Sequence, residues 1–276
     1  MIYKTLAIFL PPISNKMDKH NIEQIIDNLN DQKLIDKALA WYNHLLFKPI
    51  FGYEMEFYLP DDNIEKIENA LNIKLEKERG LNQYELQQGP FDDASKTCQS
   101  ILQTRQQLLA LGANLAPKPF PNDYGSSMHI HLNILMSDGS NIFQDKKILQ
   151  FAACGMCYFM SQTLFAILRL PEEYRRLDMK FMAPTHICYG NNNRTVAIRV
   201  PQAKPIRIEH RLCSNYSNPY KALFILLKSS MLGIENRFEQ YSQIFGNAFD
   251  NQYNLEALPL NTTQAQKLFN INFFLE

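Results

Sequence analysis

The sequence predicts an α+β fold in which helices pack on the outer face of a curved antiparallel sheet. Three short segments, 52–59, 127–133 and 207–211, alternate apolar residues with charged or polar ones. This alternation is expected of strands that bury one face and leave the other face polar. Longer segments around them carry apolar residues at helical spacing. Strands and helices of this kind form two packed layers around one core.

The helical segments follow one another along the chain with recognisable ends. Residues 21–46 predict one or two amphipathic helices, and residues 63–71 a short one. Asp92 and Asp93 precede a helix that ends at Gly112. Apolar residues fill 151–170, which predicts a buried helix. Asn218 and Pro219 stand in N-cap and N1 order before a last helix, expected to run to Leu232 and end at Gly233.

Bulk composition restricts the class of protein. A chain of 276 residues with 46% hydrophobic residues can bury a sizeable core. Its formal net charge is zero, which argues against nucleic acid or an anionic membrane as the main partner. The apolar run Leu6–Leu10 is too short to span a bilayer and lacks a cleavage signal. We therefore expect a cytoplasmic protein.

The five cysteines fit a reducing compartment, because an odd number without a regular framework is typical of reduced core thiols. Cys154 and Cys157 form a CxxC pattern inside the apolar helical segment. With no second ligand pair, core packing is the preferred interpretation, and a metal or redox role is the alternative.

The polar faces of the three predicted strands carry ligand-type side chains. They are Glu54 and Glu56; His129, His131 and Asn133; and Arg207, Glu209 and Arg211. Any one of these faces taken alone could be an ordinary solvated surface. If the three strands share a sheet, they form a surface of Glu, His and Arg that suits divalent cations and phosphates together. Glu78 and Glu85, which flank Gly80, add two carboxylates, although such a pair alone is weak evidence.

Eight motifs in sequence order resemble the catalytic domain of the glutamine synthetase family, over about residues 52–236. They are Gly52-x-Glu54-x-Glu56-Phe57, Glu78-x-Gly80-x-x-Gln83-x-Glu85, Lys118-Pro119, Gly125-Ser126-x-x-His129-x-His131, Asn193-Arg194, Arg199-Val200-Pro201, Arg207-x-Glu209-x-Arg211 and Asn218-Pro219-Tyr220. The segments Ala183-Pro184-Thr185 and 192–201 look most like the branch that joins glutamate to organic amines, as in gamma-glutamylpolyamine synthetases.

The resemblance implies an ATP-dependent ligase of nitrogen metabolism, with a helical segment at 1–48 and a glutamine synthetase-like catalytic domain at 49–276. Glutamate is phosphorylated on its side chain, and ammonia or an organic amine such as a polyamine then displaces phosphate. Glu56, Glu78 and Glu85 would hold one Mg²⁺, or Mn²⁺. Glu54, His129 and Glu209 would hold a second. Two cations can neutralise the charge that spreads over the phosphate oxygens during transfer.

The remaining roles implied by the resemblance concern the substrates. Arg194 and Arg199 would act on the transferred phosphate as catalytic residues. The nucleotide would be bound by His131, Asn133, Lys204 and Arg207. The carboxylates of glutamate would be bound by Gly125, Arg176 and Arg211. Guanidinium groups suit these tasks because they bind oxygen pairs in a bidentate way.

Three departures from the family pattern affect these expectations. Met182 stands where the mobile flap usually offers a Glu to ammonium, and Tyr124 stands where an Asn is usual. Residues 1–51 contain no candidate for the family's N-terminal β-grasp domain, which completes the neighbouring subunit's site. The resemblance implies a homo-oligomer, but this absence argues against the family's ring. The alternative function is a degenerate relative that binds nucleotide or partner subunits without turnover.

Overall fold

A single sheet of eight strands forms one layer of the protein, in the order β2-β3-β1-β4-β7-β6-β5-β8. The computed structural model describes residues 19–61 and 63–276. The apolar run at 6–10 and the rest of 1–18 lie outside the described residues. The strands are β1 (Lys48–Tyr58), β2 (Glu76–Lys77), β3 (Gln83–Phe91), β4 (Met128–Leu135), β5 (Tyr189–Asn191), β6 (Ile198–Val200), β7 (Ile208–His210) and β8 (Gln243–Ile244).

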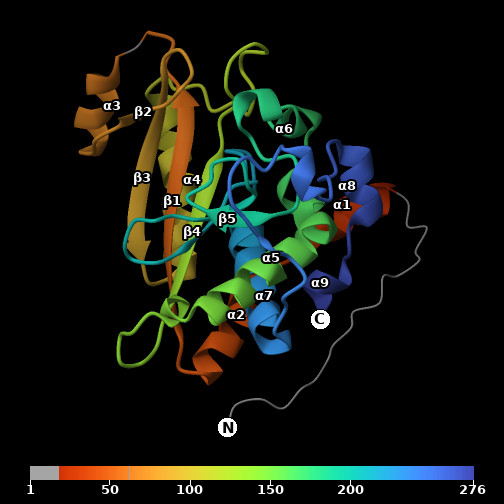
Figure 1. Cartoon of the computed structure of the whole chain (residues 1–276). Helices are drawn as coiled ribbons and strands as arrows, with labels where there is room; N and C mark the ends of the chain where they lie inside the picture. The colour runs from red at the N-terminus through yellow and green to blue at the C-terminus, as the bar shows by residue number, and fades with distance from the viewer. Residues whose placement is uncertain (1–18, 62) are drawn as a thin grey trace.

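The helices are α1 (Lys19–Asn28), α2 (Asp31–His44), α3 (Ile64–Leu71), α4 (Ala94–Ala110), α5 (Lys146–Ile167), α6 (Pro171–Tyr174), α7 (Pro219–Asn236), α8 (Thr262–Leu268) and α9 (Asn272–Leu275). Short 3-10 turns lie at 142–144, 179–181 and 251–253. Figure 1 shows the long helices stacked beside the strands. The α+β fold class is confirmed. The sheet is antiparallel from β2 to β6, whereas β5 pairs in parallel with both β6 and β8.

Strand β1 separates the core from the polar face by strict alternation. Tyr53, Met55 and Phe57 are buried on the helix side. The Tyr53 hydroxyl lies 2.9 Å from both Ser100 Oγ and Thr104 Oγ1 of α4, so its only polar atom is satisfied there. The intervening Glu54 and Glu56 therefore point to the opposite face.

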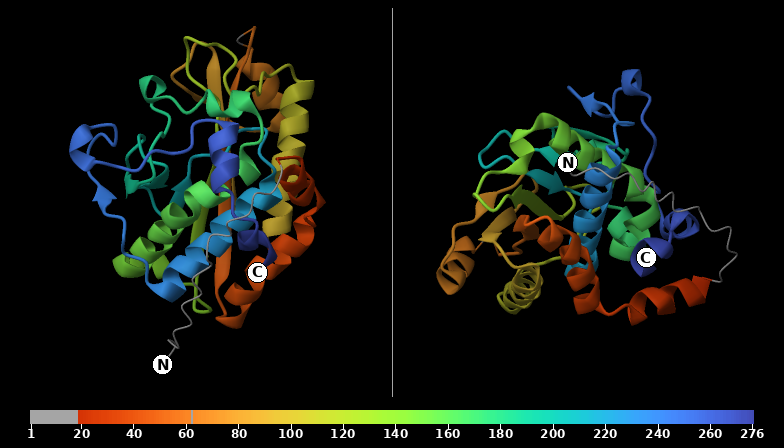
Figure 2. Two further views of the ribbon diagram at one scale, coloured as in Figure 1. Left: turned by 90° about the vertical axis from the view of Figure 1, so that its right-hand side faces the viewer. Right: turned by 90° about the horizontal axis from the view of Figure 1, so that it is seen from below.

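Helix α7 is the centre of the helical layer, with α2, α4 and α5 packed around it (Figure 2). Glycines let α5 and α7 approach closely: a Cβ at Gly155 would lie 2.2 Å from Ser229 O, and one at Gly233 would lie 2.2 Å from Phe151 O. The prediction that the helix beginning after Asn218 stops before Gly233 is therefore wrong. The helix continues to Asn236, and Gly233 is a packing residue inside it.

Helix α5 is long and apolar enough to cross a membrane, but most of its apolar stretch is buried inside the fold. One such helix is weak evidence for a membrane span, and its burial against α7 matches the predicted core helix. All five cysteines, including Cys154 and Cys157, are buried free thiols, as expected for core packing.

The segment 21–46 forms two helices, in agreement with the prediction of one or two. They divide at Asn30, whose side chain accepts a hydrogen bond from Lys33 N. The motif 207–211 forms only a three-residue strand. Asn193 and Arg194 lie in the turn between β5 and β6. The division at residue 48 stays a prediction, although Ile35 and Tyr42 of α2 belong to the same apolar core as β1.

Candidate active site

The register of the sheet brings four of the predicted metal ligands onto one polar face around β1. Glu54 lies opposite His129 of β4, and Glu56 lies opposite Glu85 of β3. One strand further, Glu209 of β7 pairs with His131 of β4. Residues directly opposite on neighbouring strands have their side chains on the same face. Segments far apart in the sequence are thus joined into one site.

Two groups of ligand atoms lie close enough together to share a cation. In each of the groups Glu56–Glu78–Glu85 and Glu54–Glu85–His129, the ligand atoms lie within 4.8 Å of one another. The first group is the first predicted set. In the second predicted set, His129 Nδ1 lies 3.0 Å from Glu54 Oε2 and 3.5 Å from Glu209 Oε1.

The charges of this cluster are unbalanced on the β3 side. Burial, followed by the nearby charges of Glu54 and Glu56, raises the pKa of Glu85 to about 9. Burial and the charge of Glu56 also raise the pKa of Glu78. Carboxylates held this close together repel one another unless a cation lies between them. A set of carboxylates with one imidazole fits Mg²⁺ or Mn²⁺, which prefer oxygen ligands.

On the β7 side, positively charged side chains compensate the charge of the carboxylates. Burial by itself would raise the pKa of Glu209, but Arg211 and His129 outweigh it and hold the pKa below its usual range. Arg199 NH1 lies 2.9 Å from Glu209 Oε2, and Arg211 NH1 lies 2.5 Å from Oε1. Burial likewise tends to raise the pKa of Glu54, but hydrogen bonds with His129 and His131 hold it well below the usual range.

The predicted nucleotide-binding residues lie beyond His131 along the sheet. Arg207 Nε donates to His131 Nδ1 at 3.2 Å, and its NH1 donates to the carbonyls of Ala203 and Pro205. Asn133 is buried two residues after His131, on the same face of β4. Lys204 lies exposed in the loop between β6 and β7.

The predicted substrate-binding residues meet at the opposite end of the face. The buried Arg176 donates to the carbonyls of Leu212 and Cys213 at 2.6 and 3.3 Å. A Cβ at Gly125 would lie 2.4 Å from Cγ of Arg176, so only glycine leaves room for this arginine. The predicted catalytic residue Arg194 lies beside the first carboxylate group, with its NH1 3.6 Å from Glu78 Oε1.

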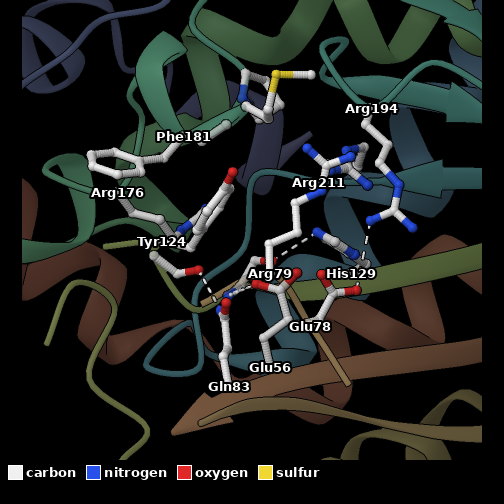
Figure 3. A pocket seen from close by; sticks show the side chains of 15 residues that line it. Glu56, Glu78, Arg79, Gln83, Tyr124, His129, Arg176, Phe181, Arg194 and Arg211 are labelled. Atoms are coloured by element: carbon white, nitrogen blue, oxygen red, sulfur yellow. Dashed lines mark hydrogen bonds and ion pairs between the residues drawn. The ribbon is translucent and has the colours of Figure 1, made fainter. Parts of the chain in front are cut away.

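A small pocket of about 50 Å³ joins the first carboxylate group to these arginines. Figure 3 shows Glu56, Glu78 and His129 on one side of it, Arg194 and Arg211 on another, and Tyr124 and Phe181 on a third. The full lining is Glu56, Glu78, Arg79, Gln83, Tyr124, Gly125, Ser127, His129, Arg176, Phe181, Met182, Ala183, Pro184, Arg194 and Arg211.

Sequence reasoning missed several members of this pocket. Ser127 Oγ lies 2.7 Å from Glu56 Oε2 and 2.8 Å from His129 Nε2, so it connects the two predicted metal groups. Its place two residues before His129 on the polar face was the available signal. Arg79 lies on a loop and Phe181 in the short 3-10 turn at 179–181, where no periodicity indicates which side chains point inward.

The fold and this polar face define a domain of the glutamine synthetase catalytic type. The family model for the glutamine synthetase catalytic domain matches residues 77–276, and the chain belongs to this family. Glu54 and Glu56 precede the matched residues, but the sheet register joins them to the same face.

Among curated relatives, the chain is 26% identical over 204 residues to gamma-glutamylputrescine synthetase PuuA of Escherichia coli K12, covering 69% of this chain and 42% of PuuA. It is 29% identical over 187 residues to the glutamine synthetase of Pyrococcus furiosus, covering 61% of this chain and 42% of that enzyme. The chain therefore spans less than half the length of these relatives.

A solved structure described as a GmaS/ADP complex has the same fold. It superposes with a TM-score of 0.73 at 20% identity, covering 86% of this chain and 67% of the other. An unliganded GmaS structure gives a TM-score of 0.72 at 21% identity, covering 86% and 66%.

Proposed function

We propose that this chain carries the active site of an ATP- and Mg²⁺-dependent ligase that joins glutamate to an amine through a gamma-glutamyl phosphate. The observation that carries the proposal is the polar sheet face, where crowded carboxylates lie beside a row of arginines. Such a face provides for cations and for anionic phosphates side by side. Membership of a family of C–N bond-forming ligases supports this reading of the chemistry.

In the proposed reaction, an oxygen of the glutamate side-chain carboxylate attacks the terminal phosphorus of ATP, and ADP leaves. The amine nitrogen then bonds to the acyl carbon, the bond from carbon to the phosphate oxygen breaks, and the nitrogen releases a proton. Glu56, Glu78 and Glu85 would hold one divalent cation and Glu54, His129 and Glu209 a second. When bound, these cations neutralise charge on the transferring phosphate.

The arginines have separate tasks in this proposal. Arg194 and Arg199 stabilise the negative charge that develops on the transferred group, as preorganised donors do at other transfer sites. Arg176 and Arg211 hold the carboxylates of glutamate against Gly125. His131, Asn133, Lys204 and Arg207 contact the nucleotide. Arg199 and Arg211 are held in place by Glu209 before any substrate arrives, which reduces the cost of ordering them.

The pocket wall favours an organic amine over ammonia as the acceptor. Phe181, Met182 and Tyr124 line it together, with the rings of Tyr124 and Phe181 5.5 Å apart. A thioether and two aromatic rings contact an alkyl chain better than they stabilise a small ammonium ion, which prefers a carboxylate. A monoamine or diamine therefore fits this wall, and a polyamine is one member of that class.

The decisive experiment is ADP release by the purified chain with ATP, Mg²⁺ and glutamate, supplying ammonia, a monoamine or a diamine in turn. We expect turnover with an organic amine and its loss in Glu56→Gln. Glu65→Gln, an exposed carboxylate of α3, is the matched control and should retain turnover. Unchanged ADP release in Glu56→Gln would overturn the metal assignment.

A second candidate function is nucleotide binding without turnover. Met182 at the flap position favours it, because no carboxylate stands there to accept a proton from the amine. It predicts that ATP with Mg²⁺ raises the melting temperature while no acceptor releases ADP.

A further inference from the structure

A second cavity, of about 350 Å³, lies between the end of α4, the loop 113–116 and the loop after β7. It shares no lining residue with the candidate active site. Its walls are mostly apolar, with a few polar groups among them. The lining consists of Arg105, Leu109, Ala113, Asn114, Leu115, Ala116, Asn215 and Tyr216.

Arg105 brings a positive charge to this cavity. Its NH2 group donates to Ser217 O at 2.7 Å and to Met128 Sδ at 3.3 Å, both of which are neutral acceptors. Its Nε is buried and has no hydrogen-bond partner. Within residues 19–61 and 63–276, Arg105 forms no ion pair with a carboxylate. A half-buried guanidinium in this condition attracts an anion.

Burial lowers the pKa of Arg105 to about 10, so the side chain is still protonated at neutral pH. The positive charge therefore persists under the conditions in which a ligand would bind.

Asn215 supplies a second polar group. It is 1% exposed, and its Nδ2 donates to Glu56 O at 2.7 Å, which fixes the amide orientation. Its Oδ1 is buried without a partner. Polar atoms of this kind usually have a partner in native structures, so Asn215 is a second residue of the cavity lining that carries an unsatisfied polar atom.

We propose that this cavity binds a small monocarboxylate with an apolar body. The carboxylate pairs with Arg105, and the body packs against Leu109, Ala113 and Leu115. A volume of this size lies at the lower end of the roughly 300–1,000 Å³ typical of small-molecule pockets. A single cation matches a single negative charge, whereas a phosphate dianion would leave one charge unpaired in an apolar cavity. The proposal is independent of the ligase function.

Isothermal titration of the whole chain with acetate, isovalerate and phenylacetate tests it, alongside phenylacetamide as the uncharged match of phenylacetate. Affinity should rise from acetate to phenylacetate, because more apolar area is buried. Phenylacetamide should bind about tenfold or more weakly, because the charge-assisted hydrogen bond is lost. Failure of all three acids to bind, or equal binding of acid and amide, would overturn the proposal.

Variants locate the binding in the cavity. Arg105→Met should weaken phenylacetate binding about tenfold or more, whereas Lys96→Met, which removes an exposed charge from the same helix, should not. Leu109 is 58% exposed, so Leu109→Trp can fill the cavity from its rim without disturbing the core. Leu109→Trp should abolish phenylacetate binding. It therefore tests the proposal by itself if Arg105→Met fails to fold. Full binding to Leu109→Trp would place the ligand elsewhere and overturn the proposal.

Discussion

Glu85 shows how a single residue can reduce stability where it supports a site. It is 5% exposed and lies among Glu54, Glu56 and Glu78, and within the described residues the one side chain that donates a hydrogen bond to it is Gln87, at 2.9 Å. A buried carboxylate surrounded by like charges is held in place by the rest of the fold at a cost in free energy. We expect this cost to be recovered when a cation binds.

Glu85→Gln should therefore raise the free energy of unfolding of the metal-free chain at neutral pH by about 1–2 kcal/mol, because the parent chain must protonate Glu85 in order to fold, whereas glutamine is neutral already and keeps the shape. It should also weaken the stabilisation that Mg²⁺ provides. Thermal and urea unfolding with EDTA or with Mg²⁺ measure both effects. A variant that is less stable than the parent chain in EDTA would show that repulsion at Glu85 is not the dominant effect.

Glu173 is a buried carboxylate outside the candidate site. Its Oε2 accepts hydrogen bonds from the backbone of Arg169 and Leu170, each at 2.7 Å, and its Oε1 accepts one from Ser214 at 2.5 Å. Burial raises its pKa, although the three donors oppose this. Because the folded pKa lies above the unfolded value, the folded state binds more protons, and stability falls as pH rises from about 4.5 through the folded pKa.

Glu173→Gln should remove this pH dependence, since the amide carbonyl can still accept from the backbone while its NH₂ group faces the serine hydroxyl. The free energy of unfolding of the variant relative to the parent chain should increase between about pH 4.5 and pH 7. Urea titrations at several pH values measure it. A difference that stays constant with pH would contradict the assignment.

Individual residues of the site were largely predictable from the sequence. Glu54, Glu56, His129 and Glu209 lie on strands in which apolar and polar side chains alternate. This period of two places all four side chains on the polar face. Arg79 and Phe181 were not predictable, because loop conformation depends on tertiary contacts. Arg105 was also missed, because it interrupts no pattern along α4. Its significance depends on the cavity beside it and on the lack of an ion pair among the described residues, which only the folded structure shows.

At the scale of elements, the crossing of α5 and α7 depends on two glycines. Gly155 and Gly233 face each other so closely that a methyl group on either would meet the backbone of the partner helix. A rigid backbone cannot move aside as a flexible side chain can. From the sequence, Gly233 was read as a helix end because a glycine late in an apolar helix is a common stop signal.

Gly155→Ala should lower the free energy of unfolding by about 2–4 kcal/mol, because the two helices must separate to admit the methyl group. Gly112→Ala is the matched control: its φ of 94° disfavours alanine, but a Cβ there meets nothing within 4 Å. We expect about 1 kcal/mol for the control, from backbone strain alone. Similar losses in both variants would mean that helix contact is not the cause at Gly155.

For the molecule as a whole, the proposed cations should stabilise the folded chain. Carboxylates from β1, β3 and the loop after β2 must come together to hold them, and they do so only when the sheet is formed. Binding to the folded state alone adds about 2.7 kcal/mol to the free energy of unfolding at a hundredfold excess over Kd.

Mg²⁺ should therefore raise the melting temperature of the parent chain, and EDTA should reverse the rise. Glu56→Gln should respond less, because it removes one ligand of the first group. Calorimetry with a Mg²⁺ series measures this. An equal response in the parent and in Glu56→Gln would show that Mg²⁺ acts elsewhere on the chain.

The pairing of β1 with β4 also determines what a sheet with the wrong strand register would lose. Glu54 and Glu56 share β1 with Tyr53, Met55 and Phe57, so a slip of one residue would exchange the two sets between core and polar face. A slipped sheet would place acidic groups among apolar helices and leave no paired carboxylates to bind a cation. The proposed cations would therefore bind only the correctly aligned sheet, and by binding they would stabilise it relative to its misaligned alternatives.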